Sequence, residues 1–288
     1  MWRLLLIWLW ACSLGASTNP YETGAELFRQ KKYQEAIAAL QASAVSEKAD
    51  TPEYRESMVM IGQSYFMLSQ APKAIPWLEK APGSTEANYM LGYAYLQNGQ
   101  AAQSEAAFAR LFNLNPDSAA GHLLAGQMML KKEFEKEAVD EIAKALAIDP
   151  KLPNAHFILG EIAITRGRVD EGIEELRKEL SLNPNSSMAW YRLGDAYQRR
   201  SEWDAAIPNL ERAVWLNQDF SGPYILLGKC YFKVSNYSNA EGILKRALAL
   251  DPNNRAALYL LGQTLTAEGR SEEARAVLDK LKGLLPQQ

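Results

Sequence analysis

The chain has 288 residues, of which 48% are hydrophobic and 23% charged, a composition typical of a folded globular protein. Its formal net charge is −3, and its lysines and arginines are spread along the chain, which argues against nucleic acid as a partner. The two cysteines, Cys12 and Cys230, exclude a disulfide framework, and Cys230 is expected to be a small buried hydrophobe.

Residues 1–17, MWRLLLIWLWACSLGAS, predict a secretory signal peptide. Arg3 is their only charged residue, and the apolar run from Leu4 to Ala11 is far shorter than the about 20 residues of a membrane-spanning helix. The small residues that follow offer cleavage after Ala16 or Ser17. The chain is therefore expected to be exported, to the periplasm or the secreted space.

A second interpretation of the same segment stays open. Leu9-Trp10-Ala11-Cys12 resembles a bacterial lipobox, in which Cys12 would be lipidated and become the mature N-terminus. The protein would then be a lipoprotein anchored to the outer membrane, and contact with a membrane is expected only through this lipid. After the signal, Asn19 and Pro20 predict the start of a helix, with Asn as the cap and Pro in the first turn.

A glycine recurs every 34 residues along most of the chain. This series comprises Gly92, Gly126, Gly160, Gly194, Gly228 and Gly262. Two earlier members, Gly24 and Gly62, are spaced by 38 and then 30 residues, which together equal two periods. An insertion of about one helical turn is thus matched by a deletion of the same length, so helices can lengthen and shorten there without changing the face they present.

Other residue types keep a fixed distance from the glycine. Twelve residues after it stand small residues: Ala36, Ala74, Ser104, Ala138, Gly172, Ala206, Ala240 and Ala274. Sixteen residues after it stand large apolar ones: Leu40, Leu78, Phe108, Ile142, Leu176, Leu210, Leu244 and Leu278. Prolines end most repeats, and the apolar residues follow helical spacing, so each repeat is predicted to hold two helices. One pair alone cannot bury its apolar stripe and needs its neighbours.

The segment WYRLGDAYQRRSEWDAAIPNLERAVWLNQ resembles a tetratricopeptide repeat, and its seven neighbours share the same columns. The resemblance covers residues 18–288 and implies an all-α fold, a right-handed α-α superhelix (a solenoid) of about eight helix-turn-helix repeats. The expected repeats are approximately 17–50, 55–84, 85–118, 119–152, 153–186, 187–220, 221–254 and 255–288.

The resemblance also implies a function, a non-catalytic scaffold or adaptor that binds a partner protein or peptide in a concave groove lined by the first helix of each repeat. The candidate groove residues are Phe66, Tyr89, Tyr93, Phe157, Glu161, Tyr191, Asp195, Lys229, Phe232 and Tyr259. Their aromatic and aliphatic character suits a peptide with apolar anchors. Aromatic residues in these columns equally suit packing between helices, and both interpretations stay open.

No motif for catalysis is present in the sequence. There is no glycine-rich phosphate loop, nucleophile elbow or cysteine pair with metal spacing, so we expect neither enzyme activity nor a cofactor. His122 and His156 are 34 residues apart, at equivalent places in adjacent repeats. Since no further His or Cys could complete a metal site, they are expected to be packing histidines, with no metal. Glu174 and Glu175 are expected to be solvated.

Two further functions are kept as alternatives to the adaptor. One is a lipid-anchored assembly factor of the bacterial envelope, similar to a pilotin, which depends on modification of Cys12. The other is a regulatory subunit of an enzyme complex. At the C-terminus, the apolar residues Leu278, Leu281, Leu284 and Leu285 predict an edge that self-associates or contacts a partner.

Overall fold

The computed structural model describes residues 19–46 and 51–284, and every element within these ranges is a helix, as predicted. The predicted signal peptide, Cys12 and Leu285 lie outside the described residues. The chain divides into two compact units, residues 1–144 and 145–288, which are described separately. None of the described helices has the length and apolar character needed to cross a membrane.

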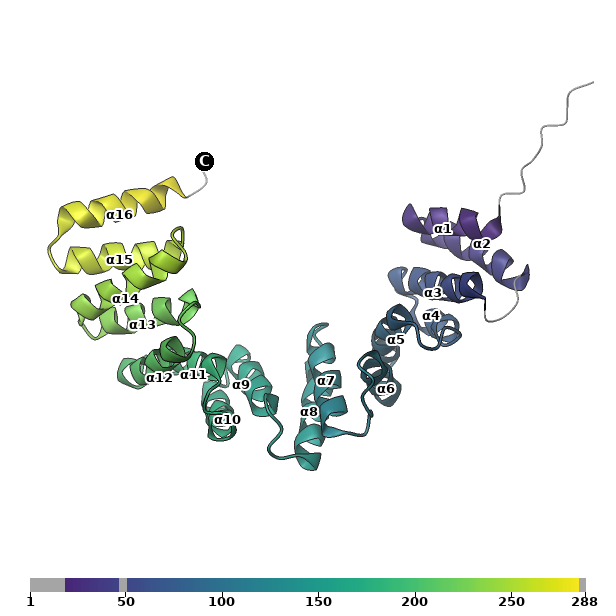
Figure 1. The fold of residues 1–288 in the computed structure, drawn as a ribbon, viewed down its shortest axis with the longest axis horizontal. Helices are drawn as coiled ribbons and strands as arrows, with labels where there is room; N and C mark the ends of the chain where they lie inside the picture. Colours follow the sequence, from purple (N-terminus) through teal and green to yellow (C-terminus); the bar gives the residue numbers. More distant parts are fainter. Residues whose placement is uncertain (1–18, 47–50, 285–288) are drawn as a thin grey trace, which may run out of the picture. The chain divides into compact units, whose positions relative to one another are not determined.

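The first unit contains seven described helices and the beginning of an eighth. They are α1 (Pro20–Arg29), α2 (Tyr33–Ser46), α3 (Pro52–Met67), α4 (Ala71–Leu78), α5 (Thr85–Gln97), α6 (Ala101–Leu111), α7 (Ala119–Leu130) and α8 (Glu135–Ile148). Each odd-numbered helix and its successor come from one repeat, and the pairs follow one another in chain order (Figure 1).

The second unit continues the same pattern from within α8 to the last described residue. Its helices are α9 (Ala155–Thr165), α10 (Val169–Leu182), α11 (Ser187–Arg199), α12 (Trp203–Leu216), α13 (Ser221–Lys233), α14 (Tyr237–Leu250), α15 (Arg255–Ala267) and α16 (Ser271–Gly283). Within this unit the two helices of a pair pack together, and each second helix also packs on the first helix of the next pair. Cys230 is fully buried in α13, as predicted, and burial raises the pKa of its thiol.

The repeated glycine allows the two helices of a pair to approach closely. A Cβ atom added at Gly194 would lie 2.5 Å from Cγ of Leu210, which stands sixteen residues later. The same two columns meet in all eight pairs, from Gly24 against Leu40 to Gly262 against Leu278. The glycine is therefore required by the apolar side chain of the second helix, whose branch occupies the space of the missing Cβ.

The turn between the two helices of a pair depends on a column that the sequence analysis did not identify. Seven residues after each glycine the backbone has a positive φ, between 58° and 78°. These residues are Lys31, Ser69, Gly99, Glu133, Gly167, Ser201, Ser235 and Gly269. The left-handed conformation ends the first helix and reverses the chain within a few residues. Because five of these eight residues are not glycine, the residue types in this column did not indicate a left-handed turn.

The irregular spacing of Gly24, Gly62 and Gly92 corresponds to unusual lengths of the two helices in the second repeat. The first helix, α3, has 16 residues, whereas its partner α4 has only 8 and contains Pro76. Side chains cap most first helices, and Asn19 caps α1 as predicted, accepting a hydrogen bond from the Tyr21 amide at 3.1 Å. The altered lengths therefore leave the pairing of glycine with the large apolar residue unchanged at Gly62 and Leu78.

Helix α9 begins in a different way from its equivalents. Asn154 precedes it in the left-handed conformation, and its side chain makes no cap. Instead, the fully buried carboxylate of Glu179, on α10, accepts hydrogen bonds from the backbone N–H groups of Asn154 and Phe157 at 3.1 and 3.3 Å. A carboxylate at a helix N-terminus satisfies free donors and also interacts favourably with the helix dipole.

Candidate functional site

An open hollow of about 630 Å³ lies on the first-helix side of the first unit, between α1, α3 and the start of α5. Its apolar wall comes from both first helices, with charged residues of both signs around it. The lining residues are Tyr21, Glu22, Ala25, Phe28, Arg29, Arg55, Glu56, Val59, Met60, Ser84 and Glu86. Such a wall suits an apolar side chain of a partner, while the rim can hydrogen-bond to its backbone.

A second hollow of about 460 Å³ adjoins the first, because Glu86 lines both. It is formed by α5, the end of α6 and α7, and is lined by Thr85, Glu86, Tyr89, Met90, Leu111, Phe112, Met128 and Lys131. Tyr89 and Phe112 remain 42% and 56% exposed, so two aromatic rings are accessible beside this hollow. The two hollows together form a continuous surface across four helix pairs of the first unit.

The three groove residues predicted in the first unit lie in different environments. Tyr89 lines the second hollow, and Phe66 is half-buried between neighbouring clusters of the core. Tyr93 is only 1% exposed, and its hydroxyl donates a hydrogen bond to the Met128 carbonyl oxygen at 3.1 Å. Burial also raises the pKa of Tyr93 above its usual range. The prediction that Tyr93 lines an open groove is therefore wrong, because its ring and its hydroxyl are both satisfied in the interior.

In the second unit, four predicted residues lie on the first helices α9, α11 and α13 and already have partners in the chain. Glu161 forms an ion pair with Arg192 at 2.6 Å, and Asp195 forms one with Arg199 at 3.1 Å. Lys229 donates a hydrogen bond to the side-chain oxygen of Gln198 at 2.8 Å. The half-buried Tyr191 forms a T-shaped aromatic pair with Phe220, with ring centroids 5.2 Å apart. These polar groups would have to exchange partners to bind a ligand.

The remaining predicted residues of the second unit divide into packed and exposed side chains. Phe157 is half-buried against the core, and Phe232 is half-buried and contacts Tyr237 with ring centroids 5.7 Å apart. Tyr259 is 50% exposed, and its hydroxyl accepts a hydrogen bond from Gln263 at 2.8 Å. Tyr259 is thus an exposed counterpart of Tyr89 in the same column.

Several residues of the two hollows were not predicted from the sequence. Tyr21, Ala25 and Phe28 lie on one face of α1. Their spacing in the sequence, four and then three residues, already indicated this shared face. Phe112 lies directly after α6, the second helix of its pair. It was not predicted because only first helices were expected to line the groove.

The two histidines each contact a glutamate of the second helix in their own repeat. Nδ1 of His122 lies 2.7 Å from Glu141, and Nδ1 of His156 lies 2.7 Å from Glu175. Glu175 is accordingly half-buried rather than solvated as predicted, because hydrogen bonds to His156 and Lys178 hold it against the protein. These bonds outweigh burial and lower the pKa of Glu175.

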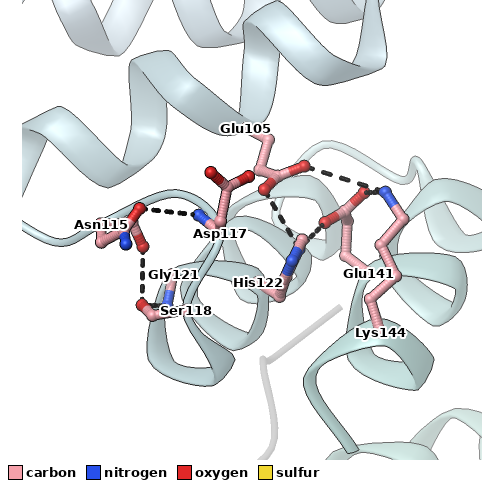
Figure 2. Close-up of polar contacts among 8 residues, drawn as sticks. All are labelled: Glu105, Asn115, Asp117, Ser118, Gly121, His122, Glu141 and Lys144. Atoms are coloured by element: carbon pink, nitrogen blue, oxygen red, sulfur yellow. Dashed lines mark hydrogen bonds and ion pairs between the residues drawn. The ribbon is translucent and has the colours of Figure 1, made fainter. Parts of the chain in front are cut away.

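His122 has a second acidic neighbour from the preceding repeat. Its Nδ1 lies 3.1 Å from a carboxylate oxygen of Glu105, so that α6, α7 and α8 each contribute one side chain to the cluster (Figure 2). Ser118 fixes the start of α7, accepting a hydrogen bond from the Gly121 amide at 3.1 Å, and so places His122 in the first turn. The expectation that His122 has no further metal-type ligands counted only His and Cys and missed these carboxylates.

Comparison with known proteins identifies the family. Models described as tetratricopeptide repeat match residues 21–88, 65–128, 189–224 and 231–288. The chain belongs to the tetratricopeptide repeat family. The repeat pattern and the α-α solenoid predicted from the sequence are thereby confirmed. No curated protein matches this tetratricopeptide repeat chain.

Solved structures share the fold of this tetratricopeptide repeat protein. MamA is 26% identical, with a TM-score of 0.53 over 55% of this chain and 93% of MamA. YrrB, described as a TPR protein with an unusual peptide-binding site, is 22% identical, with a TM-score of 0.57 over 64% of this chain and 95% of its own. PilF of Pseudomonas aeruginosa is 21% identical, with a TM-score of 0.57 over 71% of this chain and 93% of PilF.

Proposed function

We propose that this chain is a non-catalytic interaction scaffold that binds an apolar-anchored peptide or protein segment across the two adjoining hollows of the first unit. The observation that carries the proposal is the exposure of Tyr89 and Phe112 beside a hollow of about 460 Å³. Exposed aromatic residues around an apolar depression are typical energetic centres of protein interfaces. The peptide-binding site named for YrrB agrees with this use of the fold.

The geometry favours an extended or helical segment over a folded domain. The hollows adjoin at Glu86 and cross several helix pairs, so successive side chains of one segment can enter them in turn. Charges of both signs surround the first hollow, including Arg29 and Glu22, and give polar contacts at the rim. Burial of two apolar anchors provides most of the affinity, and the rim selects the sequence between them.

The test uses a photo-crosslinking amino acid at Tyr89 in the native host, compared with the same probe at the exposed Trp215 on α12. One dominant partner captured from Tyr89 and not from Trp215 is expected. The double variant Tyr89→Ala, Phe112→Ala should then bind that purified partner about tenfold more weakly or worse, with an unchanged helical circular dichroism spectrum. Capture from Trp215 alone, or unchanged affinity of the double variant, would overturn the proposal.

The scaffold acts in the exported space, as the first 17 residues predict. This location rests on the sequence of the N-terminal segment. The mass of the mature N-terminus distinguishes the two routes: cleavage after Ala16 or Ser17 gives an unmodified chain, whereas lipidation leaves an acylated Cys12. The second result would favour the alternative function, a lipid-anchored envelope assembly factor, and an intact Met1 would contradict export by either route.

A further inference from the structure

The cluster of Glu105, His122 and Glu141 is buried within the first unit. Glu105, His122 and Glu141 are 6%, 8% and 2% exposed, respectively. Each offers one atom that could bind a metal ion, a carboxylate oxygen or an imidazole nitrogen, and these three atoms lie within 4.8 Å of one another (Figure 2). They come from three successive helices, α6, α7 and α8. Two carboxylates and an imidazole nitrogen thus converge on one point in the interior.

Two carboxylates at such a point are unfavourable unless a cation accompanies them. The carboxylates of Glu105 and Glu141 both approach Nδ1 of His122, at 3.1 and 2.7 Å, and both are largely removed from solvent, so water cannot stabilise their charges. Lys144 lies 2.6 Å from Glu141 but 3.8 Å from Glu105, and its side chain is 52% exposed. Lys144 therefore compensates the pair from one side and can move into solvent, whereas buried charges are otherwise paired or bound to metals.

We propose that Glu105, His122 and Glu141 form a binding site for a divalent transition-metal ion of the Zn²⁺ class. One imidazole and two carboxylates are donors that such ions accept, and three protein ligands leave a fourth position for water or a partner group. Bonds of about 2.0–2.2 Å would separate tetrahedral ligand atoms by about 3.4 Å. The observed 2.7 and 3.1 Å from Nδ1 of His122 to the two carboxylates require only small outward movements.

Metal binding would replace a hydrogen bond of the imidazole. Without metal, Nδ1 of His122 and the carboxylate of Glu141 are hydrogen-bond partners at 2.7 Å. As a ligand, the neutral imidazole would offer the lone pair of Nδ1 to the ion and carry its proton on Nε2. The ammonium group of Lys144, which contacts the same carboxylates, is displaced because its positive charge competes with that of the ion.

The next repeat provides an internal control. His156, Glu175 and Lys178 reproduce the arrangement of His122, Glu141 and Lys144 exactly one repeat period of 34 residues later. At the place that corresponds to Glu105, however, the sequence has Val139. The described residues of the chain offer one three-ligand group of this kind, that of His122. A histidine–glutamate–lysine set without the third donor should not hold the ion.

The experiment measures Zn²⁺ binding by the full chain, prepared without a histidine tag, using equilibrium dialysis and isothermal titration calorimetry. One ion per chain is expected. Glu105→Gln should weaken the affinity about tenfold or more, and His156→Gln should leave it unchanged. Failure to retain Zn²⁺, or binding that is insensitive to both Glu105→Gln and His122→Gln, would overturn the proposal.

Lys144→Met distinguishes a metal site from a purely structural network. Removal of the competing ammonium should increase Zn²⁺ affinity, although it leaves the metal-free chain less stable. A purely structural network predicts lower stability with no gain in affinity, so that result would contradict the proposal. Circular dichroism of each metal-free variant controls for folding, and Glu105→Gln, which preserves shape, carries the test if His122→Gln fails to fold.

Discussion

At the scale of single residues, the repeated glycine determines how closely the helices of a pair approach. A Cβ at Gly194 would lie 2.5 Å from Leu210 Cγ, so Gly194→Val should lower the free energy of unfolding by about 1–3 kcal/mol through overpacking. Urea unfolding followed by circular dichroism measures this change. Gly242→Ala is the control, because nothing lies within 4 Å of its Cβ, and it should stabilise α14 by about 0.5–1 kcal/mol. Equal stability of Gly194→Val and the parent chain would show that the pair can relax.

At the turn between the two helices of a pair, a substitution can increase the stability of the chain. Ser201 has a φ of 60°, a conformation that disfavours every residue with a Cβ. Ser201→Gly should therefore raise the stability by about 1 kcal/mol, and Gly167→Ala, at the equivalent turn, should lower it by a similar amount. Thermal unfolding midpoints measure both changes. A destabilising Ser201→Gly would mean that chain flexibility in the unfolded state outweighs the relief of strain.

At the scale of helices, Glu179 joins α10 to the start of α9. Glu179→Ala leaves the amides of Asn154 and Phe157 without their acceptor and should cost about 1–3 kcal/mol. Hydrogen exchange should accelerate at the first turn of α9 in particular. Glu174→Ala on the same helix is the control, because its exposed ion pair with Arg177 contributes little. Unchanged exchange at the start of α9 would mean that Glu179 is not its cap.

Glu241 on α14 connects that helix to the final pair. Its carboxylate pairs with Arg270 at 2.8 Å and with Lys245 at 2.7 Å, and the hydrogen bonds from Arg270 and Lys245 lower its pKa. A lowered pKa stabilises the fold above the ordinary value of the carboxyl group and loses this effect as the pH falls through the folded-state value. Glu241→Gln should thus destabilise by less than about 1 kcal/mol at pH 7. The difference should begin to shrink as the pH falls below the ordinary carboxyl value of about 4.3 and vanish below the folded-state value, and a pH-independent difference would contradict this origin.

The sequence predicts the helix pairs well because their contacts repeat. Gly194 meets Leu210 within one repeat, so the same spacing recurs and the periodicity reveals it. Tyr93 could not be placed in this way, because its hydroxyl partner, the Met128 carbonyl, belongs to the next repeat. Its burial depends on how neighbouring pairs are offset, which periodicity does not specify.

The candidate site was predicted less completely for the same reason. Tyr89 was identified from its column, but Phe112 follows a second helix and reaches the hollow only through the packing of adjacent pairs. Glu105 likewise stands in a column that is mostly apolar: the next repeat has Val139 there, and Glu241, four repeats later, lies in a repeat without an equivalent of His122. Residues that break the repeat carry the specific chemistry, whereas the columns describe the shared scaffold.

At the scale of the whole molecule, a repeat array buries the apolar surface of one pair against the next, which makes the last described pair, α15 and α16, of particular interest. In α16, Leu278 lies next to Gly262 of its own pair and is half-buried. Leu281 and Leu284 are half-buried as well, with apolar surface still accessible. The described part of the predicted edge is therefore partly covered.

This partly covered edge predicts weak self-association of the chain. Full burial of a leucine side chain contributes about 1.5–3 kcal/mol, and leucines that are already partly covered contribute less. After the cost of association, the leucines of two copies fall short of the about 8 kcal/mol of a micromolar complex. Sedimentation velocity should therefore show a monomer at low concentration and a reversible dimer only at high concentration. Leu281→Glu should abolish the dimer, whereas Ala276→Glu, an equal charge change at an exposed position of α16, should preserve it. A dimer that is equally sensitive to both variants would reflect net charge, and a monomer at every concentration would show that this edge does not self-associate.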